Sequence, residues 1–145
     1  MLKVESKQDE LPCGCENYEW LSNPNRKTTY ATPSNEYKCD KSGYSDSSRI
    51  SPDWQGVNWY RIDPRIGTKI PTSSTKEKYC GTWAAGWIQG PSTPRLGQTI
   101  ESNVCFVGSS DDCAVKTNIK IRNCGQYNLY YLPDTPGCWY GYCVE

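Results

Sequence analysis

Cysteine is the residue type in this chain whose number and spacing point most directly to chemistry. Nine cysteines occur in 145 residues, and no histidine accompanies them. A zinc site favours repeated cysteine pairs two to four residues apart, and a catalytic thiolate favours a histidine base. Only Cys13/Cys15 and Cys138/Cys143 lie close together, and neither pair is C-x-x-C. The cysteines therefore predict disulfides and an oxidising compartment.

The other titratable residues point away from several function classes. The 16 basic and 16 acidic residues balance to a net charge of +0 and form no long like-charged run, unlike a nucleic-acid-binding surface. No stretch approaches the ~18 apolar residues of a membrane span. Asp111-Asp112 is interpreted as a solvated acidic turn rather than a calcium site or a glycosidase pair. We expect no enzyme activity, no cofactor, no metal, no nucleic-acid partner and no membrane insertion.

Aromatic residues give the second chemical signal, with 6 Trp and 11 Tyr. Trp54, Trp139 and Tyr140 lie in or beside predicted turns, where large side chains are harder to bury. Exposed Trp and Tyr offer rigid contact area for protein partners, and their faces stack on sugar rings. The sequence predicts a ligand-binding role for these three residues, against the alternative that they are half-buried in a loop-rich domain. Three further tryptophans lie in apolar stretches and are expected in the core: Trp59, Trp83 and Trp87.

The elements that must position these residues are short strands. The length favours one domain, and the mean hydropathy of -0.77 leaves much of the burial to aromatics and disulfides. Apolar and polar residues alternate from 115 to 122, a short turn with Gly125 follows, and 126–132 is rich in Tyr and Leu. We predict a small disulfide-rich, β-dominated α+β domain with an antiparallel hairpin at about 115–132.

The rest of the chain supplies weaker secondary-structure signals. A strand is predicted at 55–62 with a short return strand at 68–71, a buried apolar segment at 80–88, and a lead into the hairpin at 97–107. Residues 16–21 favour one helical turn. The charged residues 1–11 are expected to be a disordered terminus or linker, and 12–145 a single domain. No signal-peptide pattern is present, so the numbering is expected to start after one, or the chain to be one module of a longer protein.

Several motifs, taken together and in order, resemble a known extracellular family. They are C-E-N-Y-E-W-L-S-N-P-N-R (15–26), N-W-Y-R-I (58–62), W-I-Q-G (87–90), C-A-V-K-T-N-I-K-I-R-N-C (113–124), Y-N-L-Y-Y-L (127–132) and C-W-Y-G-Y-C (138–143). They are similar to the eight-cysteine domain of the uromodulin and zymogen-granule membrane glycoprotein type, found in zona-pellucida-associated proteins. The resemblance covers nearly the whole chain.

The resemblance implies a disulfide pairing that spacing alone leaves open among 105 possibilities. Cys13 is then left over, with a partner in another chain or in an upstream segment favoured over a free thiol. The hairpin would be stapled to the rest of the domain. The implied pairs are Cys15 with Cys124, Cys39 with Cys138, Cys80 with Cys143, and Cys105 with Cys113.

The resemblance also implies a function. We expect a secreted, non-enzymatic binding module of an extracellular, matrix or defence glycoprotein, acting on an extracellular protein. A lectin-like module that binds glycans is the first alternative, and a secreted cysteine-rich toxin is the second. Family members present an N-linked glycan to bacterial adhesins, but this chain has no N-x-S/T sequon, so that mechanism is in doubt here.

Overall fold

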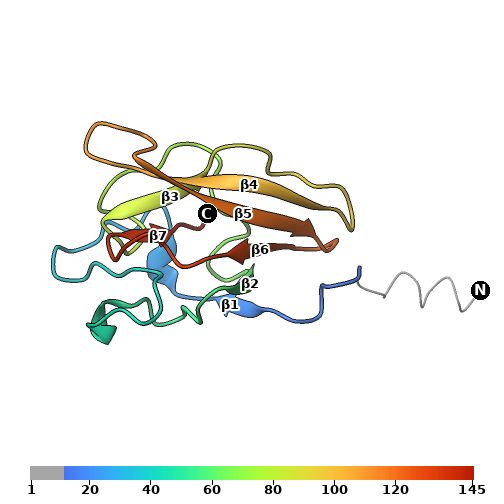
Figure 1. The fold of residues 1–145 in the computed structure, drawn as a ribbon, viewed down its shortest axis with the longest axis horizontal. Coiled ribbons are helices and arrows are strands. Elements are labelled where there is room, and N and C mark those ends of the chain that lie inside the picture. The colour runs from blue at the N-terminus through green and yellow to red at the C-terminus, as the bar shows by residue number, and fades with distance from the viewer. Residues whose placement is uncertain (1–11) are drawn as a thin grey trace, which may run out of the picture.

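Alternating apolar and polar residues build a single seven-stranded sheet in the computed structural model, which describes residues 12–145. The strand order is β1-β2-β6-β5-β4-β3-β7, with antiparallel strands in the centre and a parallel pair at each edge (Figure 1). The strands are β1 (Glu19–Leu21), β2 (Asn58–Ile62), β3 (Ala84–Ile88), β4 (Thr99–Phe106), β5 (Val115–Asn123), β6 (Asn128–Leu132) and β7 (Tyr140–Tyr142).

The β-dominated character expected from the sequence is confirmed, whereas the α component is not seen. Within residues 12–145 the only helical elements are two short 3-10 turns, η1 (Pro24–Arg26) and η2 (Ser47–Arg49). The helical turn predicted for 16–21 is wrong, because β1 pairs in parallel with β2 there. The return strand predicted for 68–71 is also wrong, since the backbone amides of Thr68 and Lys69 bond instead to the carbonyl of Glu145.

The centre of the sheet follows the alternation of the sequence. On β5, Ile119 and Ile121 are buried while Lys116 and Lys120 are exposed. β5 pairs with β4 on one side and with β6 on the other. The β5–β6 turn needs Gly125 at φ +96, a left-handed conformation that a side chain disfavours.

The main core covers one face of this sheet and is unusually aromatic. Tyr60, Tyr130, Tyr142 and Phe106 are its largest fully buried side chains. The buried hydroxyls find partners: that of Tyr60 donates to the carbonyl of Gly56, and that of Tyr142 to the carbonyl of Pro133. Aromatic rings thus provide the burial that the scarce aliphatic residues do not.

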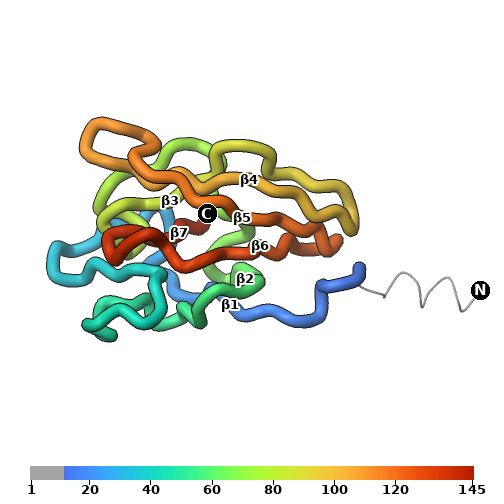
Figure 2. The backbone as a smooth tube through the Cα atoms, viewed as in Figure 1, coloured from blue at the N-terminus to red at the C-terminus, as the bar shows by residue number. Residues whose placement is uncertain are grey.

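Four disulfides fasten the long connections to the sheet. Cys15 is bonded to Cys124, Cys39 to Cys138, Cys80 to Cys143 and Cys105 to Cys113, with Cα–Cα distances of 4.7–5.9 Å. These are the pairs that the family resemblance implies. Cys15–Cys124 joins the N-terminal segment to the β5–β6 turn, and Cys105–Cys113 closes the β4–β5 loop. The long β1–β2 connection loops out at the end of the molecule where β7 lies, and Cys39–Cys138 anchors it there (Figure 2).

A buried ion network also anchors the β1–β2 connection. The Arg26 guanidinium donates two hydrogen bonds to Asp40, two to Asp53 and one to the carbonyl of Tyr142, at 2.6–3.0 Å. Burial by itself lowers the pKa of Arg26, but the two carboxylates raise it well above its ordinary value. The Arg26 guanidinium therefore stays charged and ties β7 to widely spaced points of the β1–β2 connection.

Candidate binding groove

A groove of about 410 Å³ opens where β3 and β7 meet the loop that follows β4. Its walls are mostly apolar, and we call it the Trp139 groove. Glu77 contributes its single carboxylate. The lining residues are Glu77, Trp83, Ala84, Val107, Gly108, Ser109, Ala114, Trp139 and Tyr140.

Trp139 lines both this groove and a second hollow of about 290 Å³. The second hollow, which we call the Arg49 hollow, is lined by Ser34, Asn35, Tyr37, Arg49 and Trp139. Trp139 is 54% exposed, a large value for a tryptophan in a folded domain. The guanidinium carbon of Arg49 lies 5.6 Å from the Trp139 ring centroid, within cation–π range.

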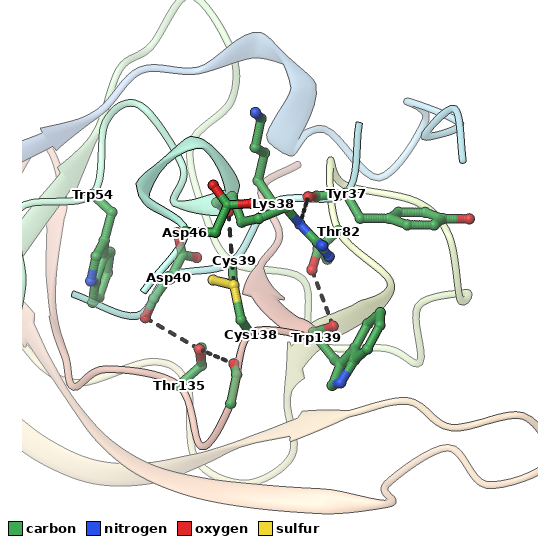
Figure 3. Close-up of a disulfide and its surroundings, with 12 residues drawn as sticks. Tyr37, Lys38, Cys39, Asp40, Asp46, Trp54, Thr82, Thr135, Cys138 and Trp139 are labelled. Atoms are coloured by element: carbon green, nitrogen blue, oxygen red, sulfur yellow. Dashed lines mark hydrogen bonds between the residues drawn. A yellow bond between two sulfur atoms is a disulfide. The ribbon is translucent and has the colours of Figure 1, made fainter. Parts of the chain in front are cut away.

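The backbone of Trp139 is held from both sides, so its exposed ring projects from a rigid base. Cys138, directly before it, is bonded to Cys39. The carbonyl of Trp139 accepts hydrogen bonds from the backbone amide of Ala84 at 2.7 Å and from the hydroxyl of Thr82 at 3.3 Å. Figure 3 shows the Trp139 side chain pointing away from this disulfide. A side chain on such a base gives contact area with little further loss of entropy.

Two more aromatic rings continue from Trp139. Trp83 lies edge-on to Trp139 at 5.9 Å, and Tyr37 lies edge-on to Trp83 at 5.1 Å. The ammonium of Lys78 lies 5.1 Å from the Trp83 ring centroid. Lys78 has φ +66, in the left-handed region, and its backbone amide bonds to the carbonyl of Trp83 at 2.7 Å. A strained turn thus sets a cation beside the groove, a pattern that clusters at functional sites.

The structure separates the three predicted ligand-binding residues. Trp139 and Tyr140 both line the Trp139 groove. Trp54 is only 6% exposed, so its expected exposure is wrong. It stacks between Tyr60 and Tyr142 at 4.9 and 5.8 Å, on the other side of the Cys39–Cys138 disulfide from Trp139 (Figure 3).

A hydrogen bond explains why a turn residue such as Trp54 enters the core. Its indole N–H donates to the Asp134 carboxylate at 2.9 Å, so the one polar group of the side chain is satisfied. Burial raises the pKa of Asp134, but hydrogen bonds from Ser42 and Trp54 outweigh this and leave the pKa below its usual range. The carboxylate is therefore a stable acceptor at neutral pH.

The sequence interpretation missed part of the groove. Trp83, expected in the core, is instead half-buried and packed against the core's edge, as are Trp59 and Trp87. Tyr37 and Arg49, which line the neighbouring Arg49 hollow, were not predicted. Tyr37 could have been found from the implied Cys39–Cys138 pairing. Tyr37 lies two residues before Cys39 and Trp139 follows Cys138, so the disulfide brings the two aromatic residues close together.

The remaining predicted site residue is Cys13. It is exposed and has no disulfide partner within residues 12–145. Among the same residues, no group of three or more histidine, cysteine or acidic side chains could hold a metal ion. The part of the chain described by the structure also contains no helix long and apolar enough to cross a bilayer.

Comparison with known proteins assigns the architecture to a family. The family model for the uromodulin-like domain of the eight-cysteine type matches residues 60–144. The pancreatic secretory granule membrane major glycoprotein GP2 of Rattus norvegicus is 28% identical over 136 residues, which cover 90% of this chain and 23% of that protein. The proteins of the same name from Mus musculus and Canis lupus familiaris are 28% and 26% identical, with the same shares covered.

The chain thus spans about a quarter of the length of the curated relatives it matches. The family match covers more than half of the chain, from within β2 through β7, and includes six of the eight disulfide-bonded cysteines. The resemblance seen in the sequence is therefore confirmed: this chain belongs to the family of uromodulin-like eight-cysteine domains.

Proposed function

We propose that this chain is a secreted, non-enzymatic binding module that contacts an extracellular protein through the Trp139 groove. The observation that carries the proposal is the 54% exposure of a tryptophan whose backbone is fixed by a disulfide and two hydrogen bonds. The four disulfides fit an oxidising compartment. The relatives' name, which places them at a secretory granule membrane, supports the same route for this chain.

The composition of the groove favours a protein partner. Trp, Tyr and Arg dominate the binding energy of protein interfaces, and Trp83, Trp139 and Tyr140 all line this groove. A volume of about 410 Å³ lies within the range of about 300–1,000 Å³ that ligand pockets occupy. The mostly apolar walls fit an inserted apolar or aromatic side chain of the partner.

The Arg49 hollow supports a second candidate, a lectin-like module. It places the rings of Tyr37 and Trp139 beside the polar side chains of Ser34, Asn35 and Arg49. Aromatic faces with adjacent donors and acceptors suit a sugar, whose ring stacks while its hydroxyls form hydrogen bonds. Because both candidates use Trp139, the class of ligand discriminates them.

The experiment is a paired screen of the oxidised protein against a panel of extracellular proteins and a glycan array. Trp139→Ala is expected to weaken binding about 30-fold, since a hot-spot tryptophan contributes about 2 kcal/mol. The matched control is Leu96→Ala, because Leu96 is also exposed, at 70%, but lines neither the Trp139 groove nor the Arg49 hollow. A protein ligand supports the first candidate and a glycan ligand the second.

A ligand whose affinity is the same for the wild type and Trp139→Ala would show that the groove is not the site. Catalytic turnover of a glycan, ester or peptide by the purified protein would contradict the non-enzymatic assignment.

Cys13 supports a separate proposal about assembly, in which it forms a disulfide with another chain or with an upstream segment. Its exposed side chain lies just before the Cys15–Cys124 staple. If the partner is another chain, non-reducing electrophoresis is expected to show a covalent dimer or adduct that Cys13→Ser abolishes. If it is an upstream segment, a monomer without a titratable thiol is expected. A monomer with one titratable thiol would contradict this.

A further inference from the structure

Arg61 on β2 lies among three aromatic rings at the other end of the sheet from the Trp139 groove. Its guanidinium carbon is 3.8 Å from the ring centroid of Tyr127, 4.9 Å from that of Trp20 and 5.7 Å from that of Tyr18. A separation of 3.8 Å requires the guanidinium to lie over the face of the Tyr127 ring. The rings shield the cation from water and stabilise its faces through cation–π contacts.

Aromatic faces do not satisfy the N–H groups, which point outward in the plane of the guanidinium. Among residues 12–145, the only hydrogen bond of this group runs from Nη1 to the hydroxyl of Tyr18, at 3.0 Å. Its Nε is buried and has no acceptor. A buried donor without a partner is strongly disfavoured, and more so on a charged group.

No carboxylate of the described chain neutralises Arg61. The ion pairs within residues 12–145 do not include it. Asp63, the nearest acidic residue along the chain, pairs with Arg65 at 2.6 Å. Glu16 is close enough to raise the pKa of Tyr127, although burial is the larger cause, yet Glu16 itself is exposed and unpaired with Arg61. The cation is therefore left with unused donors.

A small cavity of about 70 Å³ lies beside Arg61, between β2 and the β5–β6 turn. Thr68, Gln126 and Asn128 bring polar side chains to its wall, and Tyr127 brings its ring. A water molecule occupies about 30 Å³ in the liquid, so the cavity holds roughly two waters or one carboxylate group. Cationic and neutral donors around a space of this size form a site for a small anion.

We infer that this cavity binds one carboxylate group of a ligand, with Arg61 as its charged partner. A planar carboxylate matches the planar guanidinium and accepts charge-assisted hydrogen bonds from its Nη groups, because Nε is enclosed. The carboxylate comes either from an acidic peptide or from an acidic sugar. The site shares no residue with the Trp139 groove, so the inference stands apart from the function proposed above.

Arg122 on β5 provides a matched control within the same sheet. Its guanidinium carbon also lies over a ring, 4.2 Å from the centroid of Trp59. In the sheet, Leu129 of β6 pairs with Arg61 of β2 on one side and with Arg122 of β5 on the other. However, its Nε donates to the hydroxyl of Thr99 and its Nη1 to the carbonyl of Gly14, both at 2.8 Å. Arg122 is thus stacked like Arg61 but has partners for its donors.

The experiment follows the Nε–Hε resonance of Arg61 by ¹⁵N NMR during a titration with sodium acetate at constant ionic strength. A saturable shift is expected in the wild type. Arg61→Lys keeps the charge but loses the planar guanidinium and its Nη donors, and is expected to bind acetate at least tenfold more weakly. Arg122→Lys is expected to bind within about twofold of the wild type.

The wild-type titration decides the inference even if Arg61→Lys does not fold. An Arg61 resonance that does not move with acetate would mean that the cavity holds only water, and would overturn the inference, as would equal weakening by Arg61→Lys and Arg122→Lys. Titrations with a glutamate-containing peptide and with glucuronate then show whether the carboxylate comes from a peptide or from a sugar. The preferred ligand is the one that shifts the Arg61 resonance at the lower concentration. Trp139→Ala must leave acetate binding unchanged, so this test fails or succeeds independently of the groove.

Discussion

Replacing Arg26 by methionine tests whether the buried ion network holds the β1–β2 connection to β7. The change removes five hydrogen bonds but keeps a long apolar side chain in place. Asp40, whose side chain is 0% exposed, and Asp53, at 7%, would then lie in the interior without a counter-ion. Removing one partner of a buried ion pair lowers the free energy of unfolding by about 3–5 kcal/mol. That is a large fraction of the roughly 5–15 kcal/mol typical of a domain.

The loss in free energy of unfolding caused by Arg26→Met is expected to depend on pH. Burial raises the pKa of Asp53, but Arg26 and the backbone amides of Asn23 and Ser22 together hold it below its usual value. In the wild type this carboxylate stabilises the fold above its unfolded pKa of about 3.9, and the contribution is lost as the pH falls through its lower folded pKa. In Arg26→Met the largest effect on Asp53, its burial, is no longer offset by Arg26, so the pKa of Asp53 is expected to rise. The difference in stability between the two proteins should therefore be largest at neutral pH and shrink on acidification.

The assay is urea denaturation of the oxidised proteins between pH 7 and 3, with tryptophan fluorescence as the readout. The matched control is Arg65→Met, which breaks an ion pair of the same 2.6 Å length in which Arg65 is 86% exposed. It should unfold close to the wild type, because exposed pairs contribute little. A loss below about 1 kcal/mol for Arg26→Met, independent of pH, would refute the assignment of the network as a stabilising anchor.

Two further changes test the packing and the staples. Gly86→Ala on β3 would place a Cβ 2.8 Å from a buried aromatic ring, so we expect a loss of about 1–3 kcal/mol in urea denaturation, and a wild-type midpoint would contradict the packing. Replacing Cys39 and Cys138 together by serine should lower stability by about 4.7 kcal/mol in the chain-entropy treatment, against about 2.5 kcal/mol for Cys105 and Cys113, because the first bond closes the longer loop. Equal losses, or a non-reducing peptide map with other pairs, would contradict this.

The strand β5 could be predicted from the sequence because the alternation of apolar and polar residues is the dominant signal there. Alternation over 115–122 places Ile119 and Ile121 on the core face, and no competing turn or cysteine interrupts it. Residues 16–21 show the opposite case. Their composition fits a helical turn, but pairing with β2, far along the chain, overrides the local preference.

The binding groove was only partly predictable for a related reason. Trp139 could be found because an isolated turn tryptophan next to a bridged cysteine has little to pack against. Trp54 has the same local signature, yet the carboxylate of Asp134, 80 residues away, satisfies its indole and draws it into the core. Such partners depend on the tertiary fold, and no pattern of neighbouring residues contains them.

The disulfide between Cys15 and Cys124 also sets how far the module can be stretched. When tension acts between residues 15 and 143, the load crosses this bond and runs only along residues 124–143. At ~3.4 Å per residue that path extends to about 65 Å, whereas the reduced chain from 15 to 143 would extend to about 430 Å. An oxidised module therefore behaves as a short tether of nearly fixed length, and reduction converts it into a long, compliant one.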